Sequence, residues 1–152
     1  MSEGLYRLVY CSRSSFASEA GQAKIRDELL SILDAARANN RRFGVTGALL
    51  FSDGCFAQAL EGSLAAIERT FERIQRDARH HDVTVLQVEA VSQRLFGEWS
   101  MAFAGNPAGA HPLAAMTVDR AFSSAPTKAG REVIGLLQRL VTAEENWISA
   151  AA

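Results

Sequence analysis

The chain has 152 residues, of which 48% are hydrophobic and 22% charged, and this length and composition predict a globular protein with a core of its own. Its 16 Lys and Arg side chains nearly balance 17 Asp and Glu, so no net field attracts nucleic acid or an anionic membrane. No segment approaches ~20 uninterrupted apolar residues and the N-terminus lacks a signal-peptide pattern. We therefore expect a cytoplasmic protein.

Two elements are predicted in the first third of the chain. Leu5–Ser12 alternates as a strand that places Tyr10 on one face together with other large side chains. A helix is predicted from Gln22 to about Asn39, because its apolar residues recur at three- and four-residue steps. We expect this helix to end at Asn39-Asn40, since asparagine tolerates the left-handed conformation found at helix C-termini.

A hairpin is predicted next. The apolar runs Val45–Phe51 and Cys55–Leu60 flank Asp53-Gly54, and an Asp-Gly pair between two β-prone runs is a strong hairpin signal. On the second strand Gln58 shares a face with two large apolar neighbours. A buried amide needs hydrogen-bond partners, because leaving it unpaired costs roughly 1–3 kcal/mol.

The second half of the pattern is a helix followed by two strands. A helix is predicted over Leu64–Arg79 with Ser63 as its N-cap, followed by strands over Val83–Val91 and Glu98–Ala104. The last strand is expected to place three large side chains on one face: Trp99, Met101 and Phe103. The predicted fold is α+β, a ferredoxin-like βαββαββ sheet with both helices on one face.

We divide the chain into a domain at residues 1–105 and a C-terminal helical extension at 106–152, because Asn106–Pro112 interrupts the pattern. A short helix over Leu113–Arg120 and a longer one over Ala129–Trp147 are predicted in the extension. The apolar stripe of the longer helix is expected to be buried on the open face of the sheet or against a partner, since exposing it forfeits roughly 25 cal/mol per Å².

The motifs of most catalytic and metal sites are missing. The sequence has no GxSxG, HExxH, Walker or GxGxxG motif, and its two cysteines are not spaced as a CxxC pair. Polar residues nevertheless fall where burial or helix ends are expected, and a crevice between two helices with apolar walls and a polar edge would suit a flat ligand. These residues are Tyr10, Asn39, Asn40, Gln58, Asp77, Arg79 and His80.

Four segments carry a family resemblance when they are taken together. LYRLVYCS, ARANNRRFGVTGALLFSDGCFAQALEG, ERIQRDARHHDV and FGEWSMAF resemble the BLUF domains, blue-light sensors that use flavin adenine dinucleotide (FAD). The resemblance runs from about Leu5 to Phe103 and agrees in motif order and spacing. It implies the same ferredoxin-like fold.

The resemblance also implies residue roles. Tyr10 matches the photoactive tyrosine and Gln58 the switching glutamine, whereas Trp99 and Met101 match a fifth-strand pair that responds to light. The remaining matches are flavin contacts, at Ile32, Asn39, Asn40, Ile74, Asp77, Arg79 and His80. The implied cofactor is FAD, with FMN or riboflavin as alternatives.

The function implied is a blue-light photoreceptor without enzymatic activity. Excitation would draw an electron and a proton from Tyr10 through Gln58, whose amide offers one acceptor and one donor group and can therefore hold two hydrogen-bonding states. Signalling is expected to pass through a homo-oligomer, a dimer or larger, and a separate downstream protein.

Other readings stay open from the residues alone. A chromophore-free regulatory or adaptor module is one, in which Tyr10 and Gln58 are ordinary core residues and Asp77 and Arg79 an exposed ion pair. An acylphosphatase-like hydrolase is another, although the loop after the first strand lacks glycines that would shape a phosphate site. The basic pair Arg41-Arg42 would reach flavin phosphates or face solvent.

Overall fold

The computed structural model describes residues 4–15, 21–52, 54–105 and 129–139. Its elements follow in the predicted order: β1 (Leu5–Ser14), α1 (Gln22–Phe43), β2 (Thr46–Ser52), β3 (Cys55–Ser63), α2 (Leu64–Gln75), β4 (His80–Val91) and β5 (Ala102–Gly105). The strands form one sheet in the order β4-β1-β3-β2-β5, in which only the β2–β5 pair is parallel. The predicted ferredoxin-like α+β fold is confirmed.

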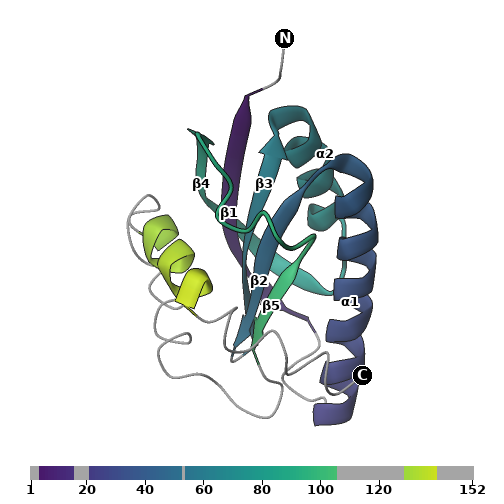
Figure 1. Cartoon of the computed structure of the whole chain (residues 1–152). Helices are drawn as coiled ribbons and strands as arrows, with labels where there is room; N and C mark the ends of the chain where they lie inside the picture. Colours follow the sequence, from purple (N-terminus) through teal and green to yellow (C-terminus); the bar gives the residue numbers. More distant parts are fainter. Residues whose placement is uncertain (1–3, 16–20, 53, 106–128, 140–152) are drawn as a thin grey trace.

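Helices cover both faces of this sheet. The paired helices α1 and α2 lie on one face, and a helical segment at residues 129–139 lies on the other (Figure 1). We call the core under α1 and α2 the helix-side core, which includes Leu8, Tyr10, Leu29, Leu33, Leu49, Phe56, Leu60, Ile67, Met101 and Phe103. The opposite core includes Val9, Cys11, Ala57, Ala59, Leu86, Phe96, Val133 and Leu137. Strand alternation assigns each side chain to its face, as predicted for β1 and β3.

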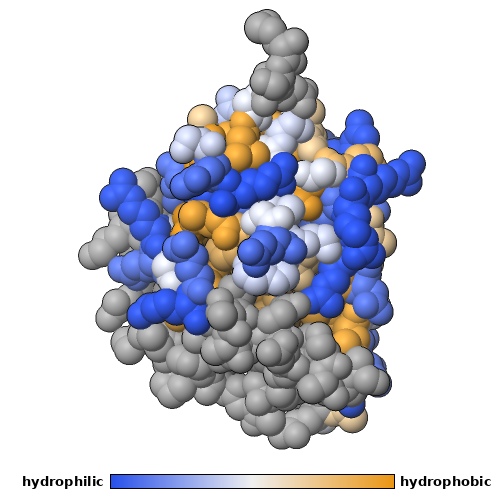
Figure 2. Space-filling model, viewed as in Figure 1, coloured by the Kyte–Doolittle hydropathy of each residue, from blue (hydrophilic) through white to orange (hydrophobic). Residues whose placement is uncertain are grey.

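The first helix continues past its predicted end. Asn39 and Asn40 lie inside α1, which runs to Phe43 and ends at Gly44, whose φ is 70° and whose N–H caps the Asn40 carbonyl. Glycine takes the left-handed conformation without steric cost, so Gly44 and not an asparagine ends the helix. Hydrophilic side chains gather over the region of α1 at the right in Figure 2.

The second helix is shorter than predicted. It begins at the predicted cap, where the Ser63 hydroxyl accepts a hydrogen bond from Ala66 N, but it ends at Gln75. The Asp77 carboxylate accepts from the Arg79 backbone N–H at 2.9 Å, an arrangement that turns the chain away from the helix. Strand β4 therefore starts at His80, three residues before the predicted start.

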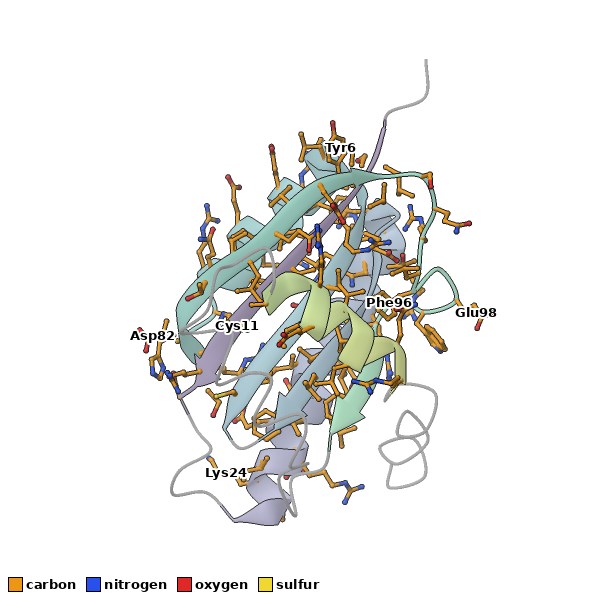
Figure 3. The ribbon with its side chains drawn as sticks, turned by 90° about the vertical axis from the view of Figure 1, so that its left-hand side faces the viewer. Tyr6, Cys11, Lys24, Asp82, Phe96 and Glu98 are labelled. Atoms are coloured by element: carbon orange, nitrogen blue, oxygen red, sulfur yellow. The ribbon has the colours of Figure 1, made fainter. Side chains whose placement is uncertain are left out.

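The fifth strand is also shorter than predicted, and the prediction that Trp99 and Met101 share a face is wrong. Both precede β5, in a segment of bends and turns that includes Phe96 and Glu98 (Figure 3). Met101 belongs to the helix-side core, whereas Trp99 packs against the opposite core. Side-chain alternation holds only in extended backbone, so it does not apply to this segment.

The described part of the C-terminal extension lies across the sheet (Figure 3). Val133 and Leu137 are fully buried in the opposite core. Gly130 approaches β4 so closely that an added Cβ would lie 2.7 Å from the Gln87 side-chain oxygen. The predicted helix over Leu113–Arg120 and the end of the predicted longer helix lie outside the described residues, and the domain division at residue 105 stays a prediction.

A buried carboxylate fixes the segment that leads to β5. Glu61 on β3 is fully buried and accepts hydrogen bonds from Arg7 Nε at 2.9 Å and from the backbone N–H groups of Leu95 and Phe96 at 2.8 Å. These donors satisfy its charge without water. The segment carrying Trp99 and Met101 is therefore anchored at its start.

We expect Glu61→Ala to lower the free energy of unfolding by about 3–5 kcal/mol, because it removes the buried carboxylate that binds Arg7 Nε and two backbone N–H groups. Urea denaturation of the two proteins measures the difference. The matched control is Glu89→Ala, which removes a half-exposed carboxylate 3.8 Å from the same arginine and should cost less than about 1 kcal/mol. Equal losses in the two variants would show that the buried contacts of Glu61 carry no special weight.

No helix in the described residues is long and apolar enough to cross a membrane.

Candidate functional site

A cavity of about 350 Å³ opens between α1 and α2, with its floor on the helix side of the sheet. Its size falls in the range of small-molecule sites, roughly 300–1,000 Å³. Every predicted site residue except Trp99 and Met101 lines it: Tyr10, Ile32, Asn39, Asn40, Gln58, Ile74, Asp77, Arg79 and His80. The wall also contains residues that we did not predict: Ala35, Ala36, Leu49, Phe56, Thr70, Arg73 and Arg76.

Tyr10 and Gln58 form a hydrogen-bonded pair on the floor of this cavity. They face each other across the antiparallel pair β1–β3, and both are almost completely buried. The Tyr10 hydroxyl donates to Gln58 Oε1, and Gln58 Nε2 donates to Met101 Sδ at 3.3 Å. Because an amide nitrogen carries two hydrogens, one N–H of Gln58 remains for a ligand in the cavity.

The surroundings keep Tyr10 neutral. Burial raises the pKa of the Tyr10 hydroxyl far above its usual value, and the negative charge of Asp77 adds to the effect. The cause is the loss of water around a group that would become an anion. Tyr10 therefore stays a proton donor to Gln58 throughout the ordinary pH range.

Asn40 joins the cavity to the segment before β5. It is 1% exposed, and its Nδ2 donates to the Ser100 carbonyl at 2.6 Å, while its Oδ1 is buried without a partner in the described residues. An unpaired buried acceptor costs about 1–3 kcal/mol, so a ligand with an N–H group would fit here. Asn39 differs, because its Nδ2 donates to the Ala35 carbonyl at 3.0 Å, one turn earlier on α1.

Three consecutive carbonyls before β5 are held in place. The Trp99 carbonyl accepts from Gly47 N at 3.2 Å, and the Met101 carbonyl accepts from Arg37 Nε at 2.9 Å. The Ser100 carbonyl between them accepts from Asn40 Nδ2. Position 47 must be glycine, since an added Cβ would lie 2.1 Å from the Ala59 carbonyl oxygen. Sequence reasoning missed Arg37, which has the appearance of a solvated residue on the polar side of a helix.

An ion pair closes one side of the cavity. The Arg79 guanidinium binds the Asp77 carboxylate, with Nη2 at 2.6 Å and Nε at 2.9 Å, and Nη1 reaches Ser31 Oγ on α1 at 3.3 Å. The hydrogen bonds from Arg79 hold the pKa of Asp77 below its usual value. The charge of Arg79 is thus already balanced by a neighbour.

His80 ties the end of α2 to β1. Its Nε2 lies 2.6 Å from the Ile74 carbonyl and its Nδ1 lies 2.8 Å from Ser12 Oγ. A carbonyl only accepts, so Nε2 carries the hydrogen, and in the neutral ring Nδ1 accepts from the serine hydroxyl. These bonds fix the imidazole on the cavity wall, while Ile32 and Ile74 supply one apolar side chain from each helix.

The fold provides a cavity of small-molecule size between two helices, with a tyrosine–glutamine pair on its floor. The family model of sensors of blue-light using FAD, BLUF, matches residues 5–102, and the chain belongs to this family. The matched region is thus a flavin-binding blue-light sensor domain.

Similar proteins agree with this assignment. The chain is 33% identical over 88 residues to photoactivated adenylate cyclase subunit beta of Euglena gracilis. The matched region makes up 57% of this chain but only 10% of the cyclase subunit. The structure of BlsA in its photo-activated state has a TM-score of 0.70 at 26% identity and covers 92% of this chain and 96% of BlsA. BlrB in its dark state has a TM-score of 0.70 at 27% identity, with coverages of 88% and 97%.

Proposed function

We propose that this chain is a blue-light photoreceptor that switches the hydrogen bonds of Tyr10 and Gln58 and signals through protein contacts. The observation that carries the proposal is the Tyr10–Gln58 bond on the cavity floor, continued by the Gln58–Met101 contact. We further propose that the protein is cytoplasmic and has no catalytic activity of its own.

FAD is the proposed cofactor, and FMN or riboflavin would present the same ring to the cavity. The unpaired Asn40 Oδ1 would accept a hydrogen bond from the ring edge, and Ile32 and Ile74 would enclose its faces. Asn39, Asp77, Arg79 and His80 lie on the same wall and are proposed as further contacts. When bound, a flavin supplies blue-light absorption and, once excited, a strong tendency to accept an electron.

With a flavin bound, Tyr10 would supply that electron together with its proton. Its raised pKa means that the hydroxyl holds its proton before illumination, and Gln58 Oε1 is the acceptor already bonded to it. When the electron returns, the proton returns to Tyr10 as well. No covalent bond or oxidation state has then changed, so only the arrangement of hydrogen bonds differs from the dark state.

Reversal of the Gln58 amide would leave Met101 without its partner. In the observed orientation Nε2 donates to Met101 Sδ, whereas the reversed amide would turn its carbonyl oxygen toward the thioether. A thioether has no hydrogen to donate, so that contact would be lost. The change would then act on the segment before β5, whose Met101 carbonyl is held by Arg37.

The segment before β5 offers a route to the other face of the sheet. Met101 lies in the helix-side core, and Trp99, two residues earlier, packs against the opposite core that includes Val133 and Leu137. Movement of this segment would disturb packing near residues 129–139. We propose that the output is a change in contacts with further copies of this chain, in a dimer or larger, and with a separate partner protein.

We expect the purified chain to be yellow and its absorption to shift to the red under blue light, because a stronger hydrogen bond to the excited ring lowers the excitation energy. Absorption spectra in the dark and after illumination measure this, and light scattering under both conditions measures assembly. A colourless chain that takes up no flavin would contradict the proposal and favour the chromophore-free adaptor. A red shift with identical assembly in both states would contradict the proposed output through oligomer contacts.

A further inference from the structure

Strand β4 is an outer strand of the sheet, and its outer edge is open to pairing. It is bonded to β1 on one side, and none of the described strands lies on its other side (Figure 1). With 12 residues it is the longest of the five described strands, and it contains no lysine, arginine or proline. Edge strands are usually short or carry such residues, because a bare row of N–H and C=O groups recruits another strand.

Exposed apolar side chains concentrate on this edge. Among the described residues three large apolar side chains are exposed: Val85 at 40%, Val88 at 49%, and Leu64 at 37%, which lies at the start of α2. Val85 stands directly opposite Tyr10 and Val88 opposite Leu8 in the β1–β4 pairing. Both valines therefore share the helix-side face of the sheet.

A bulge gives the apolar side chains of β4 a mirrored order. The register of β1 with β4 shifts between Val9 and Tyr10, so that Leu86 and Gln87 occupy the bulge. Two apolar residues precede it on the helix side and two follow it: Val83, Val85, Val88 and Ala90. A two-fold axis between Leu86 and Gln87 would set Val85 opposite Val88 of a second copy. It would also set Val83 opposite Ala90 of that copy, with every side chain on its own face.

The charges of β4 fit the same register. Asp82 and Glu89 are its acidic residues, and both are exposed. In this register Glu89 would face Thr84 of the second copy, whose hydroxyl can donate to a carboxylate. A shift of the two strands by two residues would instead set Asp82 against Glu89, and like charges directly opposite each other are destabilising. Charge and apolar pattern thus select one register.

We propose that two copies of this chain form a dimer through antiparallel pairing of β4 with β4, centred between Leu86 and Gln87. The same surface is used by both copies, so the contact closes on itself and ends at two chains. A regular strand of another protein lacks a matching bulge and would keep the match along only one half of β4. The partner that fits this edge is therefore a second copy.

The pairing would lie next to the proposed switch. Val85 is the cross-strand neighbour of Tyr10, and the Phe71 ring above it lies 5.5 Å from the Tyr10 ring between centroids. A change in the hydrogen bonds of Tyr10 would therefore act on a side chain in the dimer contact. This response to light rests on the proposed function, whereas the dimer itself does not.

The first test is sedimentation velocity of the full-length chain over a range of concentrations in the dark. We expect the wild type to form dimers and Val88→Lys to associate roughly 10- to 100-fold more weakly, because a charge would face an apolar side chain of the other copy. Leu64→Lys is the matched control, since it adds the same charge at an exposed apolar residue outside β4. It should associate as the wild type does.

A wild-type chain that stays monomeric at every concentration would overturn the proposal and leave the edge to a strand of a different protein. A Val88→Lys chain that associates as tightly as the wild type would overturn it as well.

The second test fixes the register by cross-linking. An equimolar mixture of Val85→Cys and Val88→Cys chains should form a disulfide-linked dimer with oxidised glutathione, because directly opposite Cβ atoms lie about 4.5–5.5 Å apart. Either variant alone should not, since identical positions would be three residues apart, about 10 Å along the strand. The wild type is the control, because Cys11 and Cys55 are buried. A single variant that cross-links as fully as the mixture would contradict this register.

The proposed function is read separately on the same proteins. Val88 does not line the cavity, so Val88→Lys loaded with flavin should keep the full light-induced red shift. A dimeric wild type without a red shift would count against the proposed function alone. A monomeric wild type with a full red shift would count against the β4 dimer alone.

Discussion

Tyr10→Phe is expected to abolish the light-induced red shift completely and to leave the flavin bound. The substitution removes only the hydroxyl that donates to Gln58 Oε1, and with it the source of the electron and proton. The ring should keep its place, since it is 3% exposed and packs 5.5 Å from the Phe71 ring between centroids. Difference absorption spectra before and after blue light measure the effect.

Tyr6→Phe is the matched control for this variant. Tyr6 lies on the same strand and packs against the same helix-side core, but it does not line the cavity. It should keep the full red shift. A Tyr10→Phe chain that shifts as far as the wild type would show that the hydroxyl of Tyr10 is not the donor that switches Gln58.

The pairing of Tyr10 with Gln58 illustrates what the sequence could predict. Alternation placed each residue on a definite face of its strand, and both faces proved to be the helix side. Their direct opposition depends on the register of β1 with β3, two strands separated by α1 and β2. Register between distant strands is set by the whole sheet and cannot be derived from local pattern.

The three polar cavity residues that were missed, Thr70, Arg73 and Arg76, share a physical cause. Hydrophobic periodicity separates the buried side of a helix from its polar side, but it does not show which polar residues turn toward a neighbouring helix. Thr70, Arg73 and Arg76 therefore had the appearance of solvated positions on α2. The prediction for Trp99 was wrong for another reason. Strand alternation was applied to residues before β5 whose backbone is not extended.

Gln58→Ala is expected to remove the red shift as fully as the tyrosine variant does, again with flavin retained. Gln58 is the residue on the cavity floor that contacts both the Tyr10 hydroxyl and Met101 Sδ, as acceptor and donor respectively. Alanine offers neither group, so no second hydrogen-bonding state exists. The variant should also lose about 1–3 kcal/mol of stability, because the buried Tyr10 hydroxyl is left without its partner.

Met101→Leu tests the role of the Gln58–Met101 contact separately from the role of the Gln58 amide. Leucine has a similar volume but no sulfur acceptor, so the red shift should persist while the rate of return to the dark state changes. Absorption after a light pulse gives both the size of the shift and the return rate for each variant. A full red shift in Gln58→Ala would contradict the amide switch, since the two states would then have to arise elsewhere in the cavity. Loss of the shift in Met101→Leu would instead make the thioether part of the switch itself.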